Sequence, residues 1–84
     1  MQYTYAVLGA GRQGTASAYD MARWGEAKRV ILADRDLVIA ERAALRVNQL
    51  IGAEVAEAIQ VEVTDTPALE RVLNGVDAFV SAVP

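Results

Sequence analysis

The segment Gly9–Gly14 constrains the fold of this chain more than any other part of its sequence, because it matches the pattern G-x-G-x-x-G. It follows a short apolar run and opens an alanine-rich stretch, which predicts a tight turn between a strand and a helix. In such a turn Gly9 lets the chain leave the strand, Gly11 lets a pyrophosphate approach the backbone, and Gly14 lets the helix pack against the sheet. The pattern therefore predicts a dinucleotide site, and a glycine-rich turn that binds nothing is the alternative.

The rest of the chain alternates between short apolar runs and helical patterns. Near-continuous apolar runs suit strands that are covered on both faces. The expected strands are Tyr3–Leu8, Arg29–Ala33, Ala58–Val63 and Asp77–Val83. The expected helices are Gln13–Trp24, a second from the N-cap Asp36 to Leu50 or Ile51, and a third from the N-cap Thr66, with Pro67 at N1, to about Asn74. Residues 53–57 either prolong the second helix or form its exit loop.

The order β-α-β-α-β-α-β predicts an α/β fold, since right-handed crossovers place such strands in one parallel sheet with helices on both faces. We expect a Rossmann-type sheet with strand order 3-2-1-4, apparently truncated. Small or apolar residues at helical spacing predict the buried faces of the first two helices: Ala10, Gly14, Ala18 and Ala22 in one, and Leu37, Ala40, Ala44, Val47 and Ile51 in the other. Gly25, Gly52 and Gly75 are expected to end the three helices at C′.

Composition excludes several classes of function. The 84 residues include neither cysteine nor histidine, which removes disulfides, thiolate and imidazole metal ligands, and histidine-based catalysis, so no metal site is expected. The net charge of −3 and the pI of about 4.7 make nucleic acid an unfavourable partner. The chain shows neither a basic N-terminal leader pattern nor an uncharged run of membrane-spanning length, so we expect a cytoplasmic protein that does not contact a membrane.

Asp34 is expected to set the choice of cofactor. It ends the second strand, 20 positions after Gly14, and the N-cap role falls to Asp36, which leaves the Asp34 carboxylate free. A carboxylate there accepts hydrogen bonds from the adenosine ribose and repels a 2′-phosphate, which favours NAD over NADP. Arg35 leaves the question open, because its guanidinium could stack on adenine, accept a 2′-phosphate or simply face solvent.

Seven further residues are expected to contact the cofactor. The backbone N–H groups of Arg12 and Gln13 would face the phosphates, and Arg12 either adds a side-chain contact or faces solvent. At the end of the third strand, Glu62 and Val63 would flank the adenine or simply end the strand. At the end of the fourth strand, beside Ser81, the small residues would leave room for the cofactor or simply pack within the strand; these residues are Ala82, Val83 and Pro84.

The chain resembles saccharopine dehydrogenase-like proteins, a group that includes lysine 6-dehydrogenases. The resemblance extends over nearly the whole chain, and one departure is Glu62, where the family often has Asp. The segments that carry it are Val7–Ala16, Ala18–Asp20, Ala33–Asp36, Val61–Asp65, Asn74–Asp77 and Val80–Pro84.

This resemblance implies the cofactor-binding part of an NAD(P)-dependent oxidoreductase that acts on an amino acid or its imine adduct. The family's substrate-binding and catalytic residues follow the matched segment, so residues 1–84 would be the N-terminal part of an NAD(P)-binding Rossmann domain, without the substrate domain and without catalysis of their own. A nucleotide-sensing regulatory module and an inactive folding fragment are the alternatives. The fourth strand carries no charge after Asp77, and as a free edge it predicts self-association into a homo-oligomer.

Overall fold

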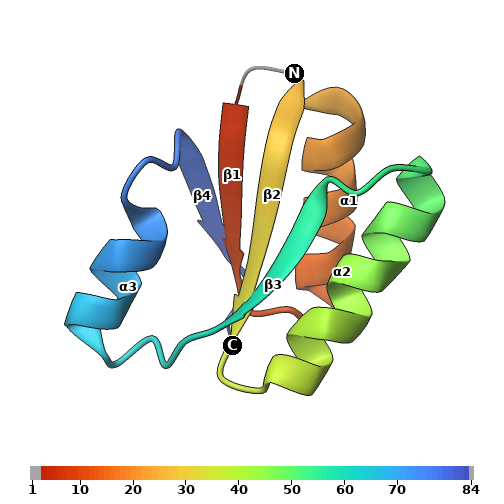
Figure 1. The fold of residues 1–84 in the computed structure, drawn as a ribbon. Coiled ribbons are helices and arrows are strands. Elements are labelled where there is room, and N and C mark those ends of the chain that lie inside the picture. Colours follow the sequence, from red (N-terminus) through yellow and green to blue (C-terminus); the bar gives the residue numbers. More distant parts are fainter. Residues whose placement is uncertain (1–2, 84) are drawn as a thin grey trace.

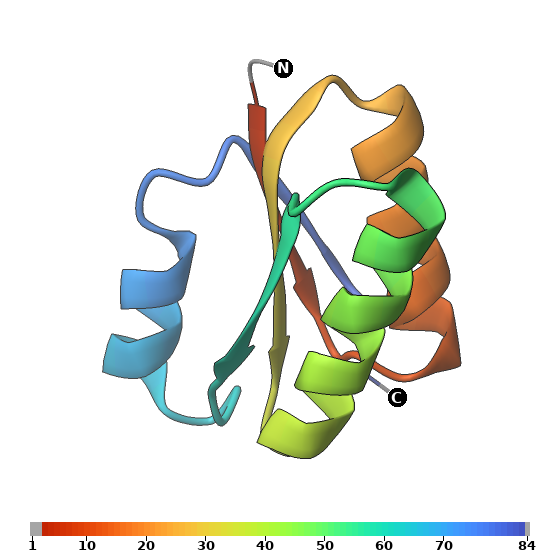
Figure 2. The same cartoon turned by 45° about the vertical axis from the view of Figure 1, so that its right-hand side comes forward.

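The computed structural model describes residues 3–83, which form one four-stranded parallel sheet with helices on both faces (Figure 1). The strand order is β3-β2-β1-β4, as the sequence predicts. The strands are β1 (Tyr3–Leu8), β2 (Ala27–Asp34), β3 (Ala56–Gln60) and β4 (Ala78–Ser81), and the helices are α1 (Arg12–Trp24), α2 (Leu37–Ile51) and α3 (Thr66–Leu73). Helices α1 and α2 lie side by side on one face, and α3 covers the other (Figures 1 and 2).

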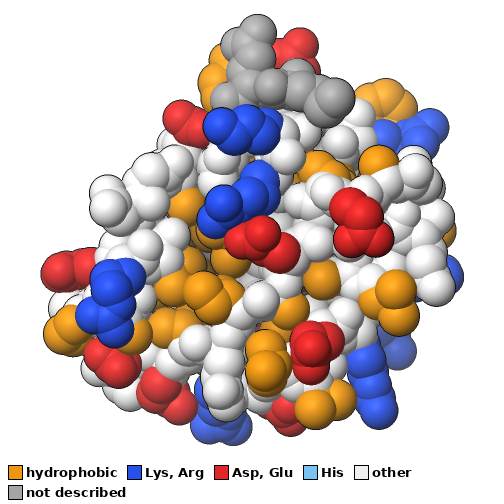
Figure 3. Space-filling view, in the orientation of Figure 1, with side chains coloured by type: hydrophobic (Ala, Val, Ile, Leu, Met, Phe, Trp, Pro, Cys, Tyr) orange, Lys and Arg blue, Asp and Glu red, His pale blue; other side chains and the backbone are white. Residues whose placement is uncertain are grey.

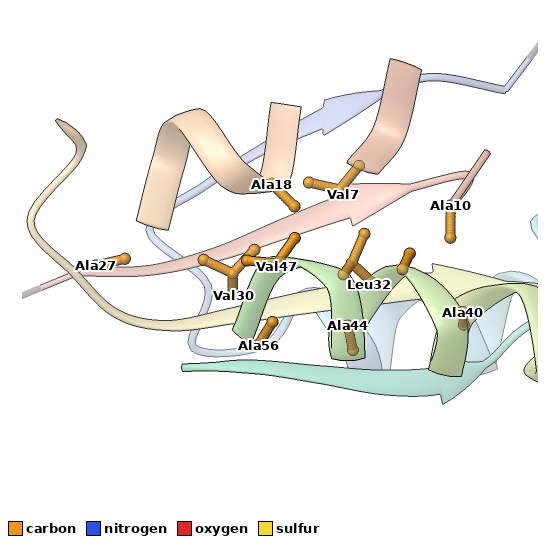
Figure 4. Close-up of a cluster of buried hydrophobic side chains, with 11 residues drawn as sticks. Val7, Ala10, Ala18, Ala27, Val30, Leu32, Ala40, Ala44, Val47 and Ala56 are labelled. Atoms are coloured by element: carbon orange, nitrogen blue, oxygen red, sulfur yellow. The ribbon is translucent and has the colours of Figure 1, made fainter. Parts of the chain in front are cut away.

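The larger half of the core lies between the sheet and the α1–α2 layer (Figure 4). Val7 of β1 and Val30 and Leu32 of β2 are fully buried there. The helices contribute mainly alanines to this layer, which allows a close approach between helix and sheet. The predicted stripe is confirmed at Ala18, which is fully buried. In α2 the prediction is wrong at Leu37, which is 38% exposed because it lies at the start of the helix, and Ala43 is buried instead.

The second half of the core lies under α3. It joins Ala6 and Leu8 of β1 to Ile31 of β2 and Val72 of α3. Helix α3 has only eight residues, so it covers this face incompletely, and hydrophobic side chains reach the surface between α3 and β3, with charged side chains of both signs around them (Figure 3).

The bounds of β3 differ most from the expected ones. The strand begins and ends earlier than the predicted Ala58–Val63, because its pairing with β2 ends where Gln60 lies opposite Asp34. Val61 is buried and its N–H still donates to the Asp34 carbonyl at 3.0 Å, but the chain then turns away. Glu62 and Val63 therefore lie in the loop after β3. Residues 53–55 belong to the exit from α2, and Ala56 begins the strand.

The other bounds shift by small amounts. Strand β2 is longer at both ends than the predicted Arg29–Ala33, β4 is shorter than the predicted Asp77–Val83, and α1 begins one residue before Gln13. Gly52 and Gly75 follow their helices with positive φ, whereas Gly25 follows α1 with φ −94°.

The N-cap predictions are confirmed at one helix and wrong at another. The Asp36 carboxylate accepts hydrogen bonds from Val38 and Ile39 at the start of α2. At α3 the cap is Asp65, which accepts from the Ala68 N–H at 3.1 Å, and not Thr66, which is already helical. Within the described residues, no helix is both long and apolar enough to cross a membrane.

Candidate functional site

A cavity of about 700 Å³ lies at the carboxyl ends of the strands, where the loops leaving β1, β2 and β3 meet the residues after β4. This is the end of the sheet toward which the strand arrows point in Figure 1. Parallel strands bring all their carboxyl ends to one edge, which is where ligands bind in open α/β sheets. Every described residue that the sequence assigns to a cofactor lines this cavity: Gly9, Gly11, Arg12, Gln13, Gly14, Asp34, Arg35, Glu62, Val63, Ala82 and Val83. Pro84 lies outside the described residues.

Four further residues line the cavity that the sequence did not assign to it: Ala33, Asp36, Ile39 and Val61. Asp36 and Ile39 lie at the start of α2, which leaves β2 beside the glycine turn. The sequence explains Asp36 as a cap and places Ala33 and Val61 in strands, and it assigns no role to Ile39, so none of the four carries a separate signal of a binding role.

The turn after β1 requires glycine at its first position. Gly9 has a φ of +95°, which side-chain-bearing residues rarely adopt, and its N–H donates to the Ala33 carbonyl at 2.7 Å. A Cβ atom on Gly9 would also lie 3.1 Å from the backbone of Ala82 and Val83. The residues after β4 therefore pack directly on the turn.

Gly14 and Gly11 have different roles in the same turn. A Cβ atom on Gly14 would overlap the carbonyl oxygen of Gly9 and lie 3.4 Å from Cγ1 of Val7, so only glycine lets α1 start this close to the turn. A Cβ atom on Gly11 would meet nothing within 4 Å. The fold itself therefore leaves position 11 open, and the space beside it belongs to the cavity.

The N-terminus of α1 faces the cavity without a side-chain cap. Its N-cap residue is Gly11, and the first turn contains no acidic residue. Helices α2 and α3, by contrast, have their first N–H groups bound by aspartates. Unpaired N–H groups and the positive end of the helix dipole favour an anion at this position.

Asp34 is not free, contrary to the expectation from the sequence. Its Oδ2 accepts a hydrogen bond from the Ala10 N–H at 2.8 Å, and its Oδ1 accepts one from the Asp36 N–H at 2.9 Å. The carboxylate thus joins the glycine turn to the start of α2. Two oxygens have four lone-pair sites, so acceptor capacity for a ligand remains.

The cavity carries charges of both signs. Arg12 and Arg35 are exposed, and neither takes part in a salt bridge within residues 3–83, where the single ion pair is Arg29 with Glu57 at 3.1 Å. Asp36 and Glu62 are also exposed at the cavity. The described residues place no group of three acidic side chains where it could hold a metal ion. The arrangement suits a ligand that combines phosphates with polar hydroxyl groups.

The structure is similar to several dehydrogenases of known structure. Quinate dehydrogenase from Corynebacterium glutamicum in complex with NAD has a TM-score of 0.84 and 26% identity over all of this chain. Saccharopine dehydrogenase (L-Glu forming) from Saccharomyces cerevisiae has a TM-score of 0.70 and 27% identity over 98% of this chain. A shikimate dehydrogenase in complex with NADP⁺ has a TM-score of 0.70 and 25% identity over 98% of this chain.

The matched region is a minor part of each of these proteins. It covers 28% of the quinate dehydrogenase, 17% of the saccharopine dehydrogenase and 26% of the shikimate dehydrogenase. The chain has no match among curated proteins. Residues 5–84 match the family model described as the saccharopine dehydrogenase NADP binding domain, which is nearly the whole chain. The chain therefore belongs to the saccharopine dehydrogenase NADP-binding domain family.

Proposed function

We propose that this chain binds a nicotinamide dinucleotide in the cavity at the carboxyl ends of its strands, as the cofactor domain of an oxidoreductase. The observation that carries the proposal is the open N-terminus of α1 beside Gly11, in a cavity that all the described candidate residues line. The pyrophosphate would lie at the N–H groups of Arg12 and Gln13. The bound cofactor would supply hydride transfer.

The adenosine half would extend from α1 toward the loop after β3. The Asp34 carboxylate lies between the glycine turn and the start of α2, and Glu62 and Val63, in the loop after β3, also line the cavity. Ala82 and Val83 line the side next to β1, where small or short side chains leave room for the other half of the cofactor. The residues of this chain therefore bind and orient the cofactor, and none of them is proposed to be catalytic.

We propose NAD as the preferred cofactor, because three carboxylates, those of Asp34, Asp36 and Glu62, line the cavity and would repel a 2′-phosphate. Arg35 is the residue that opposes this preference. The family is described by NADP binding, and the similar structures contain NAD in one case and NADP⁺ in another. If the chain binds NADPH more tightly than NADH, Arg35 outweighs the carboxylates and the proposed preference is wrong.

The proposed substrate of the whole enzyme is an amino acid or its imine adduct, which follows from the family and from the similarity to saccharopine dehydrogenase. A nucleotide-sensing module is the second candidate, since its cavity would need the same glycine turn and the same open helix. The two candidate functions differ in whether the whole protein catalyses a reaction. A protein that contains this chain and oxidises no amino acid, although it binds NADH, would favour the sensor.

Gly11→Val tests the binding site. The substitution places a branched side chain in the cavity where the fold leaves space, so we expect a folded protein that has lost most of its NADH affinity. Isothermal titration calorimetry with NADH and NADPH measures the loss, which we expect to exceed about tenfold, or about 1.4 kcal/mol.

The matched control is Ala16→Val, which adds a similar side chain to an exposed position of the same helix outside the cavity. It should bind NADH like the wild type. Unchanged NADH affinity in a folded Gly11→Val variant would place the nucleotide elsewhere and overturn the proposed site.

A further inference from the structure

The Asp34 side chain holds together the two loops that form most of the cavity. Ala10, which donates to Oδ2, belongs to the glycine turn, and Asp36, which donates to Oδ1, caps α2. Ala10 is only 2% exposed, so in the folded structure its N–H is bound by the carboxylate and shielded from water. A buried N–H without a partner is unfavourable, and the turn would have to rearrange to satisfy it.

The backbone of Asp34 extends the same connection to the third loop. Its carbonyl accepts the Val61 N–H at 3.0 Å, where the chain leaves β3, and the preceding carbonyl, of Ala33, accepts the Gly9 N–H at 2.7 Å. The end of β2 is therefore bonded to each of the three loops that follow β1, β2 and β3. Among these bonds, the two made by the carboxylate depend on the identity of the side chain.

We propose that Asp34 is a positioning residue of the nucleotide site, which fixes the glycine turn against the start of α2 and so holds the N–H groups of α1 in place for the phosphates. This inference rests on the proposed function. It differs from ribose recognition, because it predicts that a displaced carboxylate weakens binding even when its charge is kept. A contact with the ribose can coexist with it, since the two backbone bonds leave lone pairs unused.

Asp34→Glu separates the two roles. Glutamate keeps the charge, and a carboxylate one methylene further out can still reach a ribose, so ribose recognition alone predicts nearly unchanged NADH affinity. The positioning role predicts a loss, because the longer side chain does not place both oxygens between the Ala10 and Asp36 N–H groups. We expect NADH affinity to fall about tenfold, as for a lost hydrogen bond to a charged group.

Amide hydrogen exchange, measured by NMR without nucleotide, tests the structural half of the inference independently. In Asp34→Glu the Ala10 and Asp36 amides should exchange at least about tenfold faster than in the wild type. The amides of Val7 and Leu32 in the core should keep their protection, which shows that the variant is folded. Asp34→Asn is a second variant, which keeps one acceptor oxygen and should accelerate exchange at one of the two amides.

The matched control is Asp65→Glu, which alters an equivalent carboxylate-to-backbone bond at α3, outside the cavity. It should lower the unfolding midpoint without changing NADH affinity or exchange at Ala10. Unchanged exchange in Asp34→Glu would overturn the inference, and so would faster exchange with unchanged NADH affinity. A wild-type chain that binds neither NADH nor NADPH would instead overturn the proposed function, and the exchange rates would still decide whether Asp34 holds the two loops.

Discussion

Individual polar side chains hold the loops of this domain by bonding to backbone groups of other elements. Asn48 of α2 accepts from the Val55 and Ala56 N–H groups and donates to the Ala56 carbonyl, at 2.8–2.9 Å. Asp77 accepts from the Thr4 N–H, 73 residues away in sequence. The cap at Asp36 could be predicted because its partners are two and three residues away. Contacts such as those of Asn48 with β3, of Asp77 with Thr4 and of Asp34 with Ala10 depend on the folded topology, so no local pattern indicates them.

Asn48→Ala should destabilise the domain by about 1–3 kcal/mol, because it removes the partner of the Ala56 N–H and carbonyl and leaves the Val55 N–H with the Ala53 carbonyl alone. Alanine is the better helix former, so a loss cannot come from helix propensity. Urea unfolding monitored by circular dichroism measures the change. Gln49→Ala, at the exposed neighbouring position, should change stability by less than about 0.5 kcal/mol. Equal effects of the two substitutions would contradict this role of Asn48.

At the scale of helices and strands, hydrophobic periodicity was sufficient to predict the number, type and order of the elements. It failed at the end of β3, because a buried residue in a loop has the same apolar character as one in a strand. Val61 is 5% exposed but follows the last pair between β2 and β3. The predicted N-cap of α3 was one residue too late for a related reason. Asp65 and Thr66 are both good caps, and only the backbone geometry selects between them.

The cap of α3 provides a test at this scale. Asp65→Ala should destabilise the domain by about 1 kcal/mol, since it removes the acceptor for the Ala68 N–H. Thr66→Ala should have little effect, because Thr66 lies within the helix and makes no capping bond. The comparison uses the same urea unfolding experiment. A larger loss of stability in Thr66→Ala than in Asp65→Ala would contradict the cap at Asp65 and support Thr66 as the N-cap.

At the scale of the whole molecule, the core is built from small side chains. The largest fully buried ones are Leu32, Val7, Val30 and Val47, and most of the others are alanines. A domain of this size with such a core has a small margin of stability. Phe79 of β4 is 55% exposed on the face that α3 covers only in part. Self-association through β4 stays a prediction, which sedimentation of the wild type and of Phe79→Lys would test.

A small stability margin makes ligand binding easy to detect as a change in thermal unfolding. At a free NADH concentration of about 100 times Kd, binding adds about 2.7 kcal/mol to the free energy of unfolding. For a domain of this length, that corresponds to a rise in Tm of about 10–20 °C. Differential scanning calorimetry with and without NADH measures the shift, and Gly11→Val should show almost none. A wild-type Tm that stays constant with NADH would contradict binding.

The structure brings the described candidate residues together at one cavity, and that they bind a cofactor stays a prediction. The glycine spacing and the acidic residue at the end of β2 identified two groups of residues that line the cavity, and the strand order placed the other candidate residues at the same end of the sheet. The bonding of Asp34 was not predictable, because it links residues 24 positions apart through a turn whose shape is known only from the structure. The position of Ile39 at the cavity was missed because it depends on the angle at which α2 leaves β2.

The contact between Gly14 and the carbonyl of Gly9 has a consequence for how such a sequence can evolve. Two of the three glycines are needed for the backbone to close, whether or not a nucleotide is present, and they would persist in a descendant that had lost its ligand. Position 11 has no such constraint, so it would be the first to drift. A library selected only for folding should therefore keep glycine at 9 and 14 and accept many residues at 11. Among related sequences, the residue at position 11 would separate those that still bind a nucleotide from those that keep only the fold.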